Sequence, residues 1–259
     1  MLKELYTASL GMLNQQTKLE VVSNNLANAN TTGYKKAEAF ERNLIDARAN
    51  FYNTKGDVEQ NDPPIGSYYD LTAGSMRQTD NPLDLAIEGS GFFVLQDEEG
   101  KDFLTRNGSF ALNKEGFVVA RDGKKLQGEN GNIKVDQEFF SKSRNTGESK
   151  ALDVKVAETG EVFVNDYEIG KVMLADAENK ESLQRISDAN FVYTYDSEPK
   201  YLQGNEVRLR QGWLEGSNVN IVDEMVQMID LQRQFEAGSK VIQTNDGTLE
   251  NSIRLGRYY

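Results

Sequence analysis

The chain has 259 residues, a formal net charge of −12, and neither cysteine nor histidine. This composition excludes disulfides, zinc–thiolate sites, cysteine nucleophiles and Ser-His-Asp triads, although catalysis by carboxylates or lysine stays possible. A pI near 4.7 argues against nucleic acid and anionic lipid as partners, because both are negatively charged. No apolar run reaches the roughly 20 residues that span a bilayer, and residues 1–10 do not form a cleavable secretory signal.

The N-terminal segment has the apolar period of an α-helix with one binding face. Its seam positions recur at alternating spacings of three and four, as in a coiled coil, and most of them are apolar. The apolar seam positions are Leu2, Leu5, Met12, Leu19 and Leu26. Ser9, Gln16 and Ser23 fall in the same seam and weaken it, so we expect this helix to need several partners. An asparagine-rich stretch ends the helix, with Asn30 or Gly33 in the left-handed conformation.

A second amphipathic helix is predicted at the C-terminal end. Its seam positions are Ile221, Met225, Met228, Leu231, Phe235, Ile242 and Leu249. Val222, Val226 and Ile229 widen the apolar stripe, and Ser217 or Asn218 is expected to cap the first turn. Glycines inside the helix each cost about 1 kcal/mol of helix propensity relative to alanine, so we expect the helix to depend on packing.

Between the two helices, short apolar runs alternate with turn residues, of which Asn107-Gly108 is a strong tight-turn pair. The predicted strands are 83–87, 92–95, 103–105, 109–112, 117–120, 152–156, 162–164, 172–174, 191–195 and 207–209. Strands this short and evenly spaced are typical of an antiparallel sandwich or barrel-like body. The predicted fold class is therefore α+β, with terminal helices that pair in a coiled-coil-like bundle and enclose a mainly antiparallel β body.

The sequence divides into four expected segments. They are the N-terminal helix with its asparagine-rich end (1–33), a connector (34–66), the β-rich body (67–215, with a possible division near 141–150) and the C-terminal helix (216–259). Within the connector, 40–49 has a pattern that a helix could adopt.

Two stretches invite a chemical interpretation and do not support it. The run 89–91, Gly-Ser-Gly, follows a strand, but it lacks the further glycine or Gly-Lys-Ser/Thr of a phosphate-binding loop. The acidic run 97–99 precedes Gly100 and has no EF-hand pattern around it, which indicates the solvated tip of a hairpin. We therefore expect no catalytic, cofactor-binding or metal-binding residue.

Four long motifs, in the same order along the chain, resemble the signatures of the flagellar rod and hook proteins. They lie at 23–35, 83–93, 105–116 and 216–244, while 37–75 and 140–200 carry no motif. The motif residues singled out are Asn24, Asn25, Asn28, Asn30, Thr31, Gly33, Tyr34, Gly89, Gly91, Phe92, Phe93, Asn218, Glu224, Met225, Gln232 and Arg233.

This resemblance implies a structural subunit of the basal-body rod, proximal or distal, with no enzymatic activity. It also implies export through the flagellum-specific type III apparatus without signal cleavage, and helical assembly with copies of itself and other rod and hook subunits. In that assembly the terminal helices would line an inner tube, and the polymer would act as a rigid drive shaft and export channel. The alternatives are a hook or hook-associated subunit and, with less support, a cell-wall hydrolase of the same organelle.

Overall fold

The structure is a computed structural model in which two compact units are distinguished. It describes residues 2–41, 65–135, 153–165, 167–177, 183–187, 189–193, 199–202 and 208–256, with only the backbone for 2–8, 10, 40, 41, 65–67 and 249–256. The helical unit consists of the described parts of 1–27, 37–70 and 219–259, and the β body consists of those of 28–36 and 71–218. Both predicted helices and a mainly antiparallel β body are present, so the α+β class is confirmed. No helix in the described ranges is long and apolar enough to cross a membrane.

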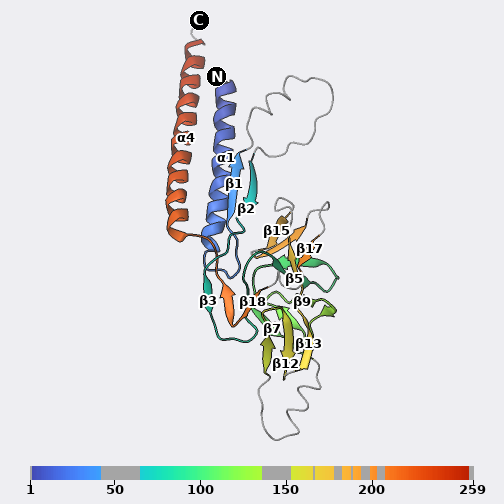
Figure 1. Ribbon diagram of the computed structural model, residues 1–259. Helices are drawn as coiled ribbons and strands as arrows, with labels where there is room; N and C mark the ends of the chain where they lie inside the picture. Colours follow the sequence, from blue (N-terminus) through green and yellow to red (C-terminus); the bar gives the residue numbers. More distant parts are fainter. Residues whose placement is uncertain are drawn as a thin grey trace. The chain divides into compact units, whose positions relative to one another are not determined.

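The helical unit is built on two long helices that lie side by side (Figure 1). Helix α1 spans Leu2–Ala27 and helix α4 spans Ile221–Gly256. Gln15, in the middle of α1, bonds to Gln234 of α4, and Asn25, near the end of α1, bonds to Glu224, near the start of α4. The two helices are therefore antiparallel.

The first turn of α4 is capped by Asn220, whose side-chain oxygen accepts the N–H of Val222 at 3.1 Å. The expectation that Ser217 or Asn218 caps this helix is wrong, because the helix begins later and Asn218 bonds elsewhere.

Gly238 faces Met12 of α1, and a Cβ at this position would lie 3.4 Å from the Met12 side chain. This glycine lets the two helices approach closely, which offsets its poor helix propensity.

A β-hairpin completes the helical unit. Strands β1 (Ala37–Glu41) and β2 (Ile65–Tyr69) pair antiparallel, and β1 packs against α1 (Figure 1). The helical pattern suggested for 40–49 is wrong at its first two residues, which extend β1 and pair with β2. The rest of that pattern lies outside the described residues.

The β body contains the other strands. They are β3 (Met76–Gln78), β4 (Leu85–Ile87), β5 (Phe92–Gln96), β6 (Asp102–Thr105), β7 (Phe110–Leu112), β8 (Val118–Ala120), β9 (Lys125–Gly128), β10 (Gly131–Asn132), β11 (Val154–Val156), β12 (Glu161–Val164), β13 (Tyr167–Lys171), β14 (Leu174–Asp176), β15 (Leu183–Ser187), β16 (Asn190–Tyr193), β17 (Lys200–Leu202), β18 (Leu209–Gln211) and β19 (Trp213–Glu215). The largest sheet has the order β15-β16-β6-β5-β9-β8-β7; in addition, β10 pairs with β9, β14 pairs with β5, and β17 pairs with β14. Smaller sheets are β11-β12-β13, β18-β4 and β19-β3, and the described pairs are antiparallel throughout. The possible division near 141–150 lies outside the described residues.

One apolar core holds these sheets together. Phe93, Leu95, Val164 and Leu174 are fully buried in it, and the Phe93 ring meets Phe110 edge to face. Each such side chain contributes roughly 1.5 to 3 kcal/mol when it is removed from water.

The Asn107-Gly108 pair does not form the tight hairpin turn that its sequence suggests. Strand β6 pairs with β5 and β16, whereas β7 pairs with β8. The glycine is required by a close approach of backbones, because a Cβ at Gly108 would lie 1.6 Å from the carbonyl oxygen of Leu85.

Tyr193 gives the β body a predictable response to alkali. Its hydroxyl donates to the backbone carbonyl of Asp176 at 3.0 Å, and burial, followed by the negative charges of Asp176 and Tyr201, raises the pKa of Tyr193 to about 12. An unfolded tyrosine ionises near pH 10, so the unfolded chain loses this proton first, and stability should fall as pH rises from about 10 to about 12. In urea unfolding across this range, the stability of Tyr193→Phe should fall less steeply with pH than that of the unsubstituted chain. A slope equal to that of the exposed control Tyr167→Phe would contradict the assignment.

Candidate functional site

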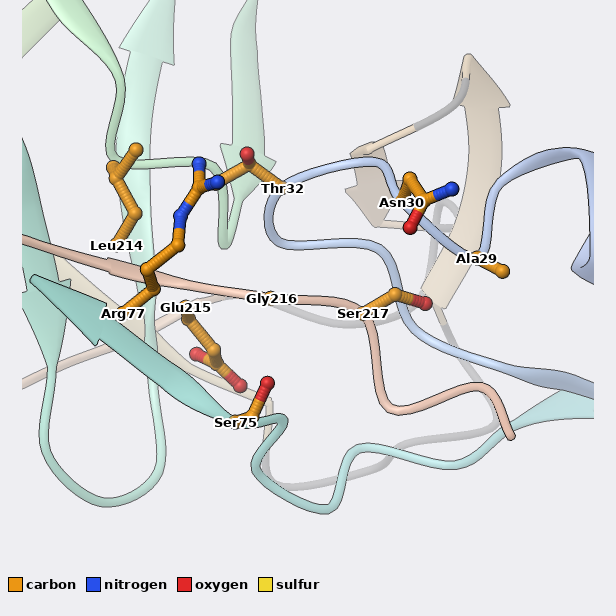
Figure 2. Close-up of a pocket in the computed structure, with 9 residues that line it drawn as sticks. All are labelled: Ala29, Asn30, Thr32, Ser75, Arg77, Leu214, Glu215, Gly216 and Ser217. Carbon is orange, nitrogen blue, oxygen red and sulfur yellow. The ribbon is translucent and has the colours of Figure 1, made fainter. Parts of the chain in front are cut away.

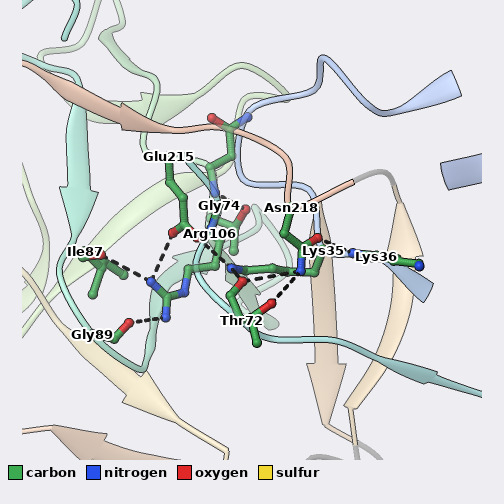
Figure 3. A network of polar contacts seen from close by, with 11 residues as sticks. Lys35, Lys36, Thr72, Gly74, Ile87, Gly89, Arg106, Glu215 and Asn218 are labelled. Atoms are coloured by element: carbon green, nitrogen blue, oxygen red, sulfur yellow. Dashed lines mark hydrogen bonds and ion pairs between the residues drawn. The ribbon is translucent and has the colours of Figure 1, made fainter. Parts of the chain in front are cut away.

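A buried carboxylate, Glu215, lies within a network of polar contacts in the β body (Figure 3). It ends strand β19 and is 1% exposed. Its Oε1 accepts from Lys35 Nζ at 2.6 Å and from the N–H of Gly74 at 2.9 Å, and its Oε2 accepts from Arg106 at 3.1 Å. Both oxygens are thus engaged by donors from three separate segments of the chain.

Arg106 connects this carboxylate to the glycine motif after β4. Its guanidinium donates to the carbonyls of Gly89 at 2.5 Å and Ile87 at 3.4 Å, and it lies over the ring of Phe92. Burial lowers the pKa of Arg106 below its usual value, while the carboxylate of Glu215 acts in the opposite direction. Arginine stays protonated in proteins, so Arg106 faces Glu215 as a cation.

The segment Gly33–Lys35 is inserted into the β body and is buried throughout. The N–H of Gly33 donates to the backbone carbonyl of Glu215 at 2.8 Å. Gly33 has a φ of +70°, and a Cβ here would lie 2.4 Å from the Arg106 backbone, so only glycine fits. Of the two residues expected to adopt the left-handed conformation, Gly33 adopts it.

The aromatic ring of Tyr34 is held beneath a second arginine. The Arg185 guanidinium lies 4.4 Å from the centroid of the Tyr34 ring and 5.2 Å from that of Phe191, and it donates to the Lys35 carbonyl. A cation between two desolvated rings is attracted by both.

Asn218 joins two further segments at the edge of this region. Its Oδ1 accepts from the N–H of Lys36 at 2.7 Å, and its amide nitrogen donates to the hydroxyl of Thr72 at 3.2 Å. Lys35 Nζ donates to the carbonyl of the same Thr72 at 2.6 Å. We call the set Lys35, Thr72, Arg106, Glu215 and Asn218 the buried clasp.

The buried clasp is suited to fixing backbone segments and not to chemistry. Glu215 already accepts from three donors, so it is poorly placed to act as a base or nucleophile. Buried ion pairs add little net stability, but removing one partner leaves an uncompensated charge and is costly. The described part of the chain holds no group of three or more metal-ligating side chains.

A pocket of about 410 Å³ lies beside the buried clasp (Figure 2). Its lining comes from the asparagine-rich segment, from β3 and from the end of β19: Ala29, Asn30, Thr32, Ser75, Arg77, Leu214, Glu215, Gly216 and Ser217. Hydroxyls, an amide and one guanidinium make it polar.

The helical unit has a polar cluster of its own, between α1 and α4. Asn25 exchanges two hydrogen bonds with the backbone of Ala37, at 2.8 and 2.9 Å, and donates to Glu224 at 3.2 Å. Asn25 and Glu224 are each 1% exposed. A buried polar pair of this kind fixes the register of two helices, because any slip leaves its members without partners.

Replacing Asn25 with alanine should destabilise the helical unit by at least about 2 kcal/mol, because it leaves buried polar groups of Ala37 and Glu224 without this partner. Thermal melting followed by far-UV circular dichroism measures the loss. Ser23→Ala, at an exposed position of the same helix, is the matched control and should change little. Equal melting temperatures for the two variants would refute the role of Asn25.

Helix α4 exposes an unusual amount of apolar surface. The exposed side chains are Ile221, Val222, Met225, Val226, Ile229, Phe235 and Val241. Val222 is 67% exposed and Val226 is 55% exposed. The first five of these recur at helical spacing and so share one side of α4, and apolar surface gathered in this way marks an interaction site.

Comparisons with known proteins agree with the sequence motifs. Residues 5–35 match the family model "Flagella basal body rod protein", residues 86–164 match "Flagellar hook protein FlgE/F/G D1 domain", and residues 210–255 match "Flagellar basal body rod FlgEFG protein C-terminal". The chain is 34% identical to the flagellar basal-body rod protein FlgG of Borreliella burgdorferi, over 99% of the chain and 100% of the relative. It is 30% identical to the FlgG of Bacillus subtilis over 99% and 100%, and 31% identical to the FlgF of Buchnera aphidicola over 98% and 97%.

The chain belongs to the flagellar basal-body rod protein family. It is a structural rod subunit, which confirms the function expected from the motifs.

The buried clasp takes one charged residue from each region that matches a rod-family model. Lys35 lies in the first matched region, Arg106 in the second and Glu215 in the third. Three family regions that are distant in the sequence are therefore tied together at one carboxylate in this rod protein.

The predicted seam residues have mixed environments in the helical unit. Met12, Leu19, Leu26, Met228, Leu231 and Ile242 are half-buried, whereas Ile221, Met225 and Phe235 are exposed. At Leu2, Leu5 and Leu249 the structure describes only the backbone. Ser9, Gln16 and Ser23 are exposed, and the buried positions of α1 include Val22 and Asn25.

The motif residues lie in both units. Asn25 and Glu224 are brought together in the helical unit, where Asn24, Gln232 and Arg233 are exposed. In the β body, Gly33, Tyr34, Gly91, Phe92 and Phe93 are buried, Asn28, Thr31 and Asn218 are half-buried, and Asn30 and Gly89 are exposed. Gly89 and Gly91 both have φ near +114°, so glycine suits this turn.

Lys35, Thr72, Arg106, Arg185 and Glu215 were not expected as site residues. The sequence offers only a weak signal for Glu215 as a site residue. It is a carboxylate at the end of a strand whose other two residues, Trp213 and Leu214, are apolar. Its partner Lys35 is 180 residues away, a separation that local patterns do not reach.

Proposed function

We propose that this rod subunit polymerises helically through α1 and α4, and that it acts in the basal body without catalysis. The observation that carries the proposal is the row of exposed apolar side chains on α4. A folded chain gains nothing by leaving these residues in water, and in a polymer of a structural subunit they would be buried against neighbouring copies.

The occupant of this surface is the helix pair of a neighbouring copy or of another rod or hook subunit. A coiled-coil-like packing of the pairs fits the alternating spacing of the apolar positions and the polar register contact between Asn25 and Glu224. Many modest contacts of this kind make a tube rigid, because the array gains avidity that no single contact has. The assembled tube would serve as the drive shaft and as the export channel.

We further propose that the subunit reaches the envelope through the type III export apparatus, without cleavage of a signal peptide, and does not bind nucleic acid. The acidic composition argues against nucleic acid as a partner, and membership of the rod protein family supports the export route. Mass spectrometry of the subunit from isolated basal bodies should find its N-terminal segment intact.

Electron microscopy of intact basal bodies tests the proposal. A tag inserted in the β body should label the rod, proximal or distal, and cells without the subunit should lack a complete rod. Label on the hook alone would favour the hook subunit instead. Clearing of peptidoglycan in a zymogram would contradict a purely structural role.

A further inference from the structure

Two lysines and a phenylalanine share one face of the largest sheet in the β body. Phe117 directly precedes β8 and is bridged to Lys134, and Val119 of β8 pairs with Lys125 of β9. Paired residues, and residues two apart on a strand, point to the same face of a sheet, so Phe117, Lys125 and Lys134 lie together. Val118, between Phe117 and Val119, is buried in the core, so the shared face is the outer one.

Both lysines are held over the same ring. The ammonium of Lys125 lies 4.5 Å from the centroid of the Phe117 ring, and that of Lys134 lies 5.3 Å from it. The attraction between each ammonium and the ring offsets part of the rotamer entropy that a lysine loses when it is held in place. The two charges are therefore partly positioned before any partner arrives. We call Phe117, Lys125 and Lys134 the cationic face.

The cationic face has no counter-ion of its own. Among the described residues, neither of its lysines forms an ion pair with a carboxylate, whereas the adjacent Lys124 pairs with Asp122 at 2.5 Å. Across the sheet from Lys125, the register places Gln96 first and Asp102 second. Asp102 is thus two strands away, about 10 Å along the sheet, which is too far for an ion pair.

The charge of this region is opposite to that of the chain as a whole. Residues 101–135 contain seven basic and four acidic residues, a net charge of +3, whereas the whole chain has a net charge of −12. The rest of each copy therefore carries a large excess of carboxylates. A basic surface on such a chain is electrostatically complementary to most of the surface of another copy.

A helical polymer joins identical copies by heterologous contacts, in which one surface of a copy meets a different surface of the next. We propose that the cationic face is one side of such a contact, and that it binds exposed carboxylates of a neighbouring copy of this chain. Phe117 adds apolar contact area between the two positioned ammonium groups. The proposal rests on the proposed function as a helically polymerising rod subunit, and it adds a contact made by the β body.

Carbodiimide cross-linking of purified basal bodies tests the partner, because this reagent joins an amine directly to a carboxylate that touches it. Mass spectrometry should find Lys125 or Lys134 joined to an aspartate or glutamate of the same chain, and these links should be absent from the isolated chain at low concentration. Lys155, which pairs with Asp153 at 3.1 Å within one copy, is the control and should give its link in both samples.

Two results of this experiment would overturn the proposal. One is the absence of any link from Lys125 or Lys134 that is specific to basal bodies. The other is a link from these lysines only to a different protein or to a peptide of the cell wall. The experiment needs no substitution, so it decides the partner even where a variant folds poorly.

Charge reversal tests what the contact does for assembly. Cells that carry Lys125→Glu together with Lys134→Glu should form about tenfold fewer complete rods, because like charges then face each other across the contact. Lys125→Arg with Lys134→Arg keeps both cations and should assemble normally, as should Lys155→Glu, a reversal at an exposed position of β11. Circular dichroism of each purified chain checks the fold, and normal rods in the folded double reversal would overturn the proposal.

Failure of the proposed function would have a different signature. Substitution of Val226 by aspartate on α4 leaves the cationic face intact, so rods that assemble despite it would refute polymerisation through the helices whatever the cross-links show.

Discussion

Replacing Glu215 with alanine should cost the β body about 3 to 5 kcal/mol of folding free energy, because Lys35 and Arg106 would remain buried without their shared counter-charge. The two cations are 1% and 3% exposed, so solvent cannot take over the role of the carboxylate. Trp213 is the single tryptophan of the chain and lies two residues away in β19. Its fluorescence during urea unfolding reports on this region.

Glu88→Ala is the matched control for this experiment. Glu88 pairs with Arg210 at 3.0 Å, but both side chains are about half exposed. Exposed pairs contribute roughly 0 to 1 kcal/mol, so this variant should unfold close to the wild-type urea concentration. An equal loss of folding free energy in both variants would contradict a larger contribution from the buried ion pairs of Glu215.

Replacing Val226 with aspartate should abolish rod assembly while the isolated chain stays folded. Val226 is 55% exposed, and surface substitutions of this kind usually change stability by less than about 0.5 kcal/mol. In the polymer the same carboxylate would be buried against an apolar neighbour, where an unpaired charge is strongly unfavourable. Motility in soft agar and electron microscopy of basal bodies measure assembly, and circular dichroism confirms the fold.

Gln227→Asp provides the control, since it places the same charge at the adjacent exposed position of α4. It should reduce assembly less, because the exposed apolar row does not include this position. Motile cells carrying Val226→Asp would refute the assembly surface.

The elements that the sequence predicts well are those with a local period. The two helices follow from spacings of three and four, and short runs such as Phe92–Leu95 become strands because apolar residues and turns bracket them. The β1–β2 hairpin has no such signal, since its strands are separated by residues 42–64. Its formation depends on packing against α1, which is a tertiary effect.

The candidate site could be predicted only in part. The motif residues Asn25 and Glu224 were identified by resemblance, but their contact across 199 positions follows from the antiparallel arrangement of the helices. From the sequence alone, Lys35 and Glu215 would be predicted to lie on the surface, because most lysines and glutamates are exposed. Only the fold brings them together in a buried place.

Burial of α4 against neighbouring subunits in the rod can be tested by thiol accessibility. The chain has no cysteine, so Val226→Cys creates a single thiol. Tyr167→Cys, at an exposed position of β13, shows whether a maleimide reagent reaches the outside of the rod. We expect both thiols to be labelled in the isolated chain and only the Val226→Cys thiol to be protected in purified basal bodies. Equal labelling of the two thiols in basal bodies would contradict it.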